Sequence, residues 1–194
     1  MRITEACFSF FGGLQKVRIL PKSRRTIIIG HNGSGKTTLL KTLYTYFKGD
    51  HILQEEEAVK TDLEFSRLAF VWAAVGEQIG DDTIKAPILG NHNDHFDTHD
   101  ILKKVISEFD LDPNKLKKSK AGGHLRLYAM LEAAAKISPD GILLVDELGR
   151  HLQIETQYLL VKALTSILPE GHLIGTTHSP CVLSNRDDDE IITL

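Results

Sequence analysis

The chain has 194 residues, of which 42% are hydrophobic and 25% charged, enough for one compact domain with its own core. Its formal net charge of −3 excludes an overall basic protein, so any nucleic acid binding must rest on a local patch or on a partner. Cys7 and Cys181 lie far apart and predict neither a zinc site nor a disulfide framework. No apolar stretch approaches the roughly 18 residues of a membrane span. We therefore expect a cytoplasmic protein with no membrane insertion.

The first third of the chain predicts strands followed by a helix. Strands are expected over 3–11 and 17–20, with Gly12 and Gly13 between them, and a short buried strand over 26–29. A helix over 38–47 follows, with apolar side chains on one face and Gly49 at its end.

The rest of the chain alternates between buried strands and helices. Strands are expected over 68–72, 142–145, 173–177 and 191–194, and helices over 98–109, 125–137 and 155–168, with a short helix after 112–113. The range 76–98 is polar and expected to be irregular. This alternation predicts an α/β fold with a largely parallel sheet.

Residues 30–37 fit the phosphate-binding pattern G-x-x-x-x-G-K-[ST] at every required position. Lys36 is expected to reach the β- and γ-phosphates of a nucleotide, and Thr37 to hold Mg²⁺ through its hydroxyl. An incidental glycine turn is the alternative, but the strand before it and the helix after it favour the phosphate loop. The expected nucleotide-binding residues are Gly30, His31, Asn32, Gly33, Ser34, Gly35, Lys36, Thr37 and Thr38.

Two carboxylates follow the apolar strand over 142–145. At the carboxyl end of such a strand, where ligands bind in open α/β sheets, Asp146 is expected to join the Mg²⁺ shell. Glu147 is expected to polarise the water that attacks the γ-phosphate. Acids at strand ends are common, so it is the preceding phosphate loop that favours this interpretation.

Three further clusters leave alternatives open. His178 follows a buried strand and could contact the γ-phosphate, or only cap the turn before Pro180. The run over 121–124 could form an anion-binding helix start or a plain turn. The stretch over 91–100 holds three histidines; His95 and His99 could ligate a metal, although such stretches are more often polar loops whose side chains cap a helix.

Taken in this order, the motifs resemble the ATP-binding cassette (ABC) ATPases over essentially the whole chain. Residues 30–37 match Walker A, 142–147 Walker B with its catalytic glutamate, 148–152 the D-loop and His178 the switch histidine. The family's signature sequence, which contacts a partner's nucleotide, falls on Ala121, Gly122, Gly123 and His124.

The resemblance implies one ABC-type domain over 1–194, with a P-loop NTPase fold. Its mostly parallel sheet would carry an antiparallel N-terminal strand pair, and a small helical subdomain would lie at about 76–137. It also implies a homodimer that encloses and hydrolyses ATP with Mg²⁺, with catalytic Lys36, Glu147 and His178.

In detail, the motifs are similar to the RecF, chromosome-maintenance (SMC) and overcoming-lysogenization-defect (OLD) ATPases, which act on DNA or in phage defence. That similarity implies a separate effector protein, a nuclease or a toxin, and nucleic acid reached through this partner.

Two departures from the family pattern keep alternatives open. Ala121 stands where the family has a serine, and only Gln78 is available as the Q-loop ligand of the metal. A membrane transporter's nucleotide-binding subunit and a non-hydrolysing ATP sensor are the alternatives. The adenine contact is open, with Phe8, Phe10 and Phe11 as stacking candidates.

Overall fold

The computed structural model describes residues 2–8, 17–50, 58–61, 67–71, 88–90, 98–108, 122–183 and 190–194. The strands are β1 (Ile3–Phe8), β2 (Val17–Ile19), β3 (Arg25–Ile29), β4 (Ala58–Thr61), β5 (Arg67–Val71), β6 (Ile88–Gly90), β7 (Ile142–Val145), β8 (His172–Thr176) and β9 (Glu190–Thr193). The helices are α1 (Lys36–Lys48), α2 (Thr98–Glu108), α4 (Gly122–Ile137), α5 (Ile154–Ile167) and α6 (Pro180–Leu183).

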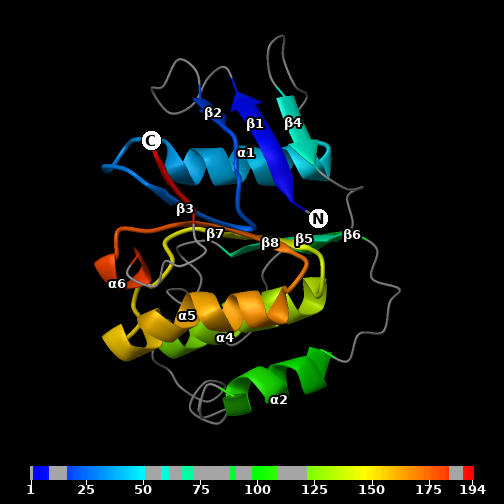
Figure 1. Cartoon of the computed structure of the whole chain (residues 1–194), viewed down its shortest axis with the longest axis vertical. Coiled ribbons are helices and arrows are strands. Elements are labelled where there is room, and N and C mark those ends of the chain that lie inside the picture. The colour runs from blue at the N-terminus through cyan, green and yellow to red at the C-terminus, as the bar shows by residue number, and fades with distance from the viewer. Residues whose placement is uncertain are drawn as a thin grey trace.

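A six-stranded sheet in the order β6-β5-β7-β8-β3-β9 divides the molecule into two layers (Figure 1). All neighbours in it are parallel except β6, which runs antiparallel to β5 at one edge. The predicted α/β fold with a mostly parallel sheet is confirmed. Because parallel strands end at the same edge, the loops after β3, β7 and β8 meet there.

Successive side chains of each central strand point to opposite faces, and this alternation separates two hydrophobic cores. Ile28, Phe70 and Leu144 belong to the core on the side of α1. Their neighbours Ile27 and Val145 belong to the core on the side of α4 and α5. Continuous apolar strands are what a sheet covered on both faces requires.

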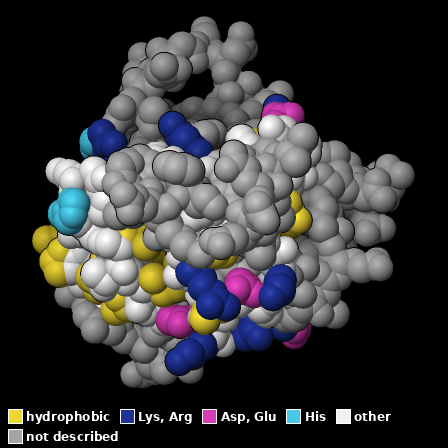
Figure 2. Space-filling model, turned by 90° about the horizontal axis from the view of Figure 1, so that it is seen from above, with side chains coloured by type: hydrophobic (Ala, Val, Ile, Leu, Met, Phe, Trp, Pro, Cys, Tyr) yellow, Lys and Arg dark blue, Asp and Glu magenta, His cyan; other side chains and the backbone are white. Residues whose placement is uncertain are grey.

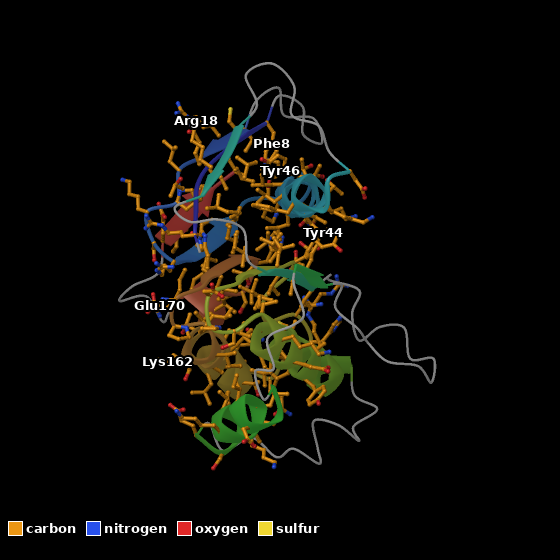
Figure 3. The ribbon with its side chains drawn as sticks, turned by 90° about the vertical axis from the view of Figure 1, so that its right-hand side faces the viewer. Phe8, Arg18, Tyr44, Tyr46, Lys162 and Glu170 are labelled. Atoms are coloured by element: carbon orange, nitrogen blue, oxygen red, sulfur yellow. The ribbon has the colours of Figure 1, made fainter. Side chains whose placement is uncertain are left out.

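Above the six-stranded sheet lie α1 and a second, three-stranded antiparallel sheet in the order β2-β1-β4 (Figures 1 and 3). The predicted antiparallel N-terminal strand pair is confirmed as β1 and β2, and β4 adds a third strand by pairing with the other edge of β1. Glu5 joins the three strands: its carboxylate accepts hydrogen bonds from Lys60 at 2.5 Å and from Arg18 at 3.0 Å. These two hydrogen bonds, Lys60 first, lower the pKa of Glu5.

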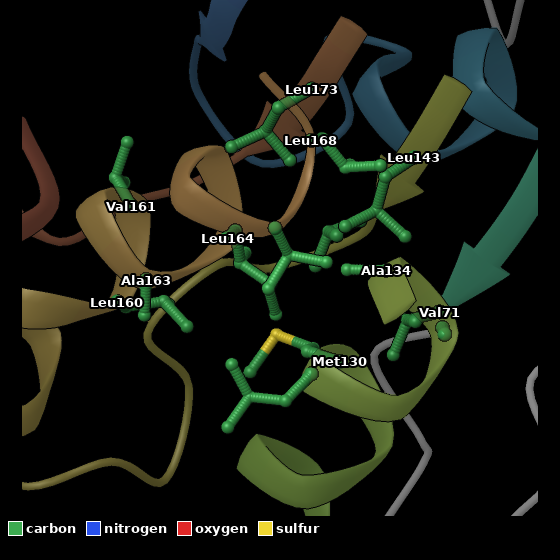
Figure 4. Packing of buried hydrophobic residues seen from close by; sticks show 14 of the residues in the cluster. Val71, Met130, Ala134, Leu143, Leu160, Val161, Ala163, Leu164, Leu168 and Leu173 are labelled. Carbon is green, nitrogen blue, oxygen red and sulfur yellow. The ribbon is translucent and has the colours of Figure 1, made fainter. Parts of the chain in front are cut away.

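The other face of the sheet is covered by α4 and α5, with α2 packed beyond α4 (Figure 1). Met130 of α4 and Leu164 of α5 lie in the same buried cluster as Leu143 of β7 (Figure 4). This packing fixes α4 against the strand that ends in the two carboxylates.

Several elements differ from the sequence-based expectations. The range 76–98, expected to be irregular, contains β6, and the short helix α6 follows β8. Helix α4 begins at Gly122 and not at residue 125. The expected helix after 112–113, and the residues beyond Phe8 in the strand expected over 3–11, lie outside the described residues. The single domain with a helical part at 76–137 stays a prediction; within that range, β6 belongs to the sheet and α4 packs against it.

Candidate functional site

The phosphate loop connects β3 to α1 at the carboxyl edge of the sheet. Gly33 and Gly35 have φ angles of 84° and 92°, in the left-handed region that glycine adopts without strain. At Gly30 a Cβ atom would lie 2.5 Å from the hydroxyl oxygen of Ser34 and 2.6 Å from the main-chain oxygen of Leu194, so there is no room for a side chain there. The loop's shape therefore depends on glycine at three of its positions.

Lys36, the first residue of α1, is folded back over the loop. Its ammonium donates to the carbonyl oxygens of Gly30 and His31, each at 2.9 Å, and the side chain is buried. Leu39, Leu40 and Leu43 pack α1 into the hydrophobic core on its side of the six-stranded sheet. The ammonium group of Lys36 is thereby held against the loop, where a phosphate group would lie in the predicted nucleotide site.

Asp146 follows β7 and is held by hydroxyl groups from two other segments. Its Oδ1 accepts hydrogen bonds from the hydroxyl of Thr37 at 2.8 Å and from that of Thr176 at 3.0 Å. The Thr176 oxygen in turn accepts the backbone N–H of Glu147 at 2.8 Å. The parallel register pairs Val145 with Gly175, which brings the following residues, Asp146 and Thr176, side by side.

Glu147 and His178 lie at the opening of the same site. The imidazole Nε2 of His178 is 3.4 Å from a carboxylate oxygen of Glu147. Glu147 has a φ of 60°, a conformation that costs a non-glycine residue about 1–2 kcal/mol. A pocket of about 240 Å³ is lined by Asn32, Gly33, Gly35, Lys36, Thr37, Thr38, Glu147 and His178. The structure thus brings the three expected catalytic side chains, Lys36, Glu147 and His178, to one pocket at the phosphate loop.

The oxygens beside Lys36 fit a small hard cation. Thr37 supplies a hydroxyl and Asp146 a carboxylate, 2.8 Å apart at the edge of the sheet, and Mg²⁺ prefers such oxygen ligands together with substrate phosphates. Gln78, the other expected metal ligand, lies outside the described residues. So do residues 91–97 of the histidine-rich stretch, and nothing is described of the His99 side chain. Within the described parts of the chain, no group of three or more metal-ligating side chains is found.

The signature glycines lie away from this pocket. Gly122 and Gly123 form the first turn of α4, and of the described residues that line the pocket, none belongs to α4. Ala121 and the side chain of His124 lie outside the described part of the structure. Phe8, a stacking candidate for adenine, is fully buried in the hydrophobic core on the side of α1, so the structure contradicts that role. Phe10 and Phe11 lie outside the described residues.

Two residues of the site were not predicted. Thr176 bridges Asp146 and Glu147, as described above. Arg126 is fully buried and donates to the main-chain carbonyl oxygens of both acidic residues. Arg126 lies in the helix expected over 125–137 and Thr176 in the strand expected over 173–177. Each contacts Asp146, which is 20 and 30 residues away along the chain, and no local pattern indicates such pairings.

A comparison with protein families agrees with this geometry. The family model described as ABC transporter matches residues 18–148, which include the phosphate loop and both acidic residues after β7. The chain belongs to the ABC family. It is therefore an ATP-binding ABC ATPase domain, and ABC ATPases bind ATP, typically with Mg²⁺.

Similar curated proteins include two named as ATP-binding proteins and one, matched over a short stretch, named as a Septu protein. The chain is 30% identical over 173 residues to the ATP-binding protein Uup of Buchnera aphidicola, covering 87% of this chain and 28% of that protein. It is 25% identical over 177 residues to the energy-coupling factor transporter ATP-binding protein EcfA1 of Staphylococcus aureus, covering 82% of this chain and 63% of that protein. A 55-residue match, 36% identical, covers 28% of this chain and 14% of the Septu protein PtuA of Bacillus thuringiensis. The chain thus spans less than two thirds of each of these relatives.

Solved structures show the same fold at low identity. A nucleotide-free ATP-binding cassette from an ABC transporter superposes with a TM-score of 0.58 at 16% identity, covering 100% of this chain and 88% of that one. The cbiO1 protein of Clostridium perfringens gives a TM-score of 0.59 at 17% identity, over 91% and 79% of the two chains. Within the described residues, every helix is too short or too polar to cross a membrane.

Proposed function

We propose that this protein hydrolyses ATP and that two copies close around two Mg·ATP molecules to drive a separate partner protein. The observation that carries the proposal is the position of Glu147, beside Asp146 and the phosphate loop and within 3.4 Å of His178. A carboxylate at the opening of a phosphate pocket can orient and polarise a water molecule, as in-line attack on a phosphoryl group requires.

Each remaining side chain has a role that its contacts support. Lys36 and the loop N–H groups bind the phosphate oxygens, and the N-terminal end of α1 adds its partial positive charge. Thr37 and Asp146 would hold Mg²⁺, which would supply positive charge against the charge that develops on the phosphates. His178 contacts the carboxylate of Glu147 from the loop after β8 and orients it toward the pocket.

The position of the signature glycines supports the proposed dimer. Neither glycine is among the described residues that line the pocket of their own chain, so we propose that they contact a nucleotide across an interface. The first turn of α4 presents main-chain N–H groups, which bind anions at helix starts. Two chains in a head-to-tail arrangement would place this turn of each against the γ-phosphate held by the other.

Hydrolysis and dimerisation are tested together with Glu147→Gln. This substitution preserves the side chain's size and removes the carboxylate that polarises water, so it should lower kcat by about 10²- to 10⁴-fold while ATP still binds. The variant should then elute as a dimer with Mg·ATP and as a monomer without it. A wild type that binds ATP but never turns it over would favour the non-hydrolysing sensor instead.

The partner is proposed to be a nuclease or a toxin, in DNA repair or phage defence. This rests on the similarity of the motifs to RecF, SMC and OLD ATPases. On the face seen in Figure 2, described basic side chains lie beside acidic ones, which fits nucleic acid contact through a partner better than direct binding. Purification of the Glu147→Gln protein with ATP should recover a second protein; recovery of neither a protein nor nucleic acid would contradict this assignment.

A transporter subunit is the second candidate. It is favoured by the energy-coupling factor transporter ATP-binding protein among the relatives and by the transporter cassettes among the similar structures. Under this alternative, the protein would fractionate with membranes through a hydrophobic partner.

A further inference from the structure

The segment over 146–152, which carries both acidic residues and the D-loop, is held from two sides. From the end of β8, the hydroxyl of Thr177 donates to the carbonyl oxygen of Leu148 at 2.7 Å, and the N–H of Leu148 donates to the main-chain carbonyl oxygen of Thr176 at 2.6 Å. From the other side, the segment contacts the beginning of α4. Glu147 and His151 both have left-handed backbone conformations, with φ angles of 60° and 62°. Such conformations persist only where the surrounding contacts enforce them.

The contact with α4 has two parts. The first is close backbone packing: a Cβ atom at Gly123 would lie 2.0 Å from the carbonyl oxygen of His151, so the first helical turn and the D-loop touch main chain to main chain. The second is Arg126, one turn further along α4. One of its terminal nitrogens donates to the carbonyl oxygens of Asp146 and of Glu147, the latter at 3.1 Å.

Arg126 is fully buried, and a buried cation is costly unless it is hydrogen-bonded. Both acceptors are main-chain oxygens of Asp146 and Glu147, the residues proposed to hold Mg²⁺ and to orient the attacking water. A guanidinium presents its donors in a rigid planar fork, so a displacement of α4 must displace these carbonyls or break the bonds. The orientation of Glu147 therefore depends on where α4 lies.

We propose that Arg126 is a positioning residue that links the signature turn of α4 to the catalytic glutamate of the same chain. This inference rests on the proposed dimer, in which Gly122 and Gly123 touch the partner's nucleotide. Binding of that nucleotide would fix α4, and through Arg126 it would fix Glu147 at the chain's own nucleotide. Each site of the dimer would thereby affect the other, and hydrolysis would be cooperative.

The test uses the full chain with Arg126→Met, which keeps the length and removes every donor, and Arg126→Lys, which keeps the charge. Met130→Ala is the matched control: Met130 is one turn away on α4 and also fully buried, but it packs in the apolar cluster. For each protein, the thermal midpoint, the Kd for a fluorescent ATP analogue, kcat and the Hill coefficient are measured well below the lowest midpoint.

We expect Arg126→Met to retain the Kd within about threefold, because it removes no pocket-lining group, and to lose about 100-fold in kcat, as small misplacements of catalytic groups do. Its Hill coefficient should fall to one. Arg126→Lys should recover part of kcat, and Met130→Ala should retain kcat and the Hill coefficient despite a lower midpoint.

Equal losses of kcat in Arg126→Met and Met130→Ala would mean that Arg126 only stabilises the fold, and would overturn the proposal. If Arg126→Met fails to fold, Arg126→Lys decides: wild-type kcat and an unchanged Hill coefficient would overturn the proposal. A wild type that turns over ATP while the Arg126 variants match it refutes only this inference. A wild type without turnover, or a Glu147→Gln protein that stays monomeric with ATP, refutes the proposed function and the inference with it.

Discussion

Thr176→Val tests whether the bridge between the two acidic residues supports the fold and the site. Valine has nearly the shape of threonine, so the substitution leaves no cavity at this fully buried position. It removes the acceptor for the Glu147 N–H and a donor to the Asp146 carboxylate. A neutral hydrogen bond contributes about 1 kcal/mol and one to a charged group about 1.5–3 kcal/mol. We therefore expect the free energy of unfolding to fall by about 2–4 kcal/mol.

The loss is measured by urea denaturation, and in a domain of this size it corresponds to a thermal midpoint lower by about 4–16 °C. Thr176→Ser is the control, because it keeps the hydroxyl and removes only a methyl group. It should lose about 1 kcal/mol and retain ATP turnover, whereas Thr176→Val should lose turnover as well. If the valine variant were within about 0.5 kcal/mol of wild type, the bridge would have no energetic role and the reasoning would be refuted.

Three further substitutions test separate parts of the structure. Lys36→Ala should weaken Mg·ATP binding by about 10- to 100-fold, the value of a charge-assisted hydrogen bond; unchanged calorimetric affinity would contradict the site. Gly123→Ala should lower the free energy of unfolding by roughly 1–3 kcal/mol through overpacking, and wild-type stability in urea would contradict the close packing. Because Lys60 and then Arg18 lower the pKa of Glu5, its contribution is present above pH 4.5, its ordinary value, and is lost as the pH falls through the lowered value. The difference in thermal midpoint between wild type and Glu5→Gln should therefore shrink in acid; a pH-independent difference would contradict the assignment.

The parts of the site that the sequence predicts are those written in one stretch of chain. The phosphate loop needs left-handed backbone, a cation and a hydroxyl within eight residues, and only a few residue types meet those needs. The same holds for an apolar strand that ends in Asp146 and Glu147. These requirements are local, so composition and spacing express them directly.

The parts that sequence reasoning missed depend on how distant segments meet. Strands β4 and β6 have four and three residues, too few to show a period of two, and pairing with an existing strand edge defines them. Thr176 reaches Asp146 because of the register between β7 and β8, and Arg126 reaches Asp146 because α4 packs on the sheet. Neither the register nor the packing leaves a motif in the chain.

The hydrogen bonds that Lys36 and Thr37 make within the protein also limit how tightly a nucleotide can bind. Lys36 already donates to two loop carbonyls, and Thr37 already donates to Asp146. Binding of Mg·ATP must exchange these bonds for bonds to phosphate oxygens and to the cation, so only the difference between the two sets contributes to affinity. In return, the left-handed glycines and the anchored start of α1 hold the loop in its binding shape, which reduces the ordering cost of binding. In the proposed dimer, the first turn of α4 would meet a phosphate that the loop has already fixed.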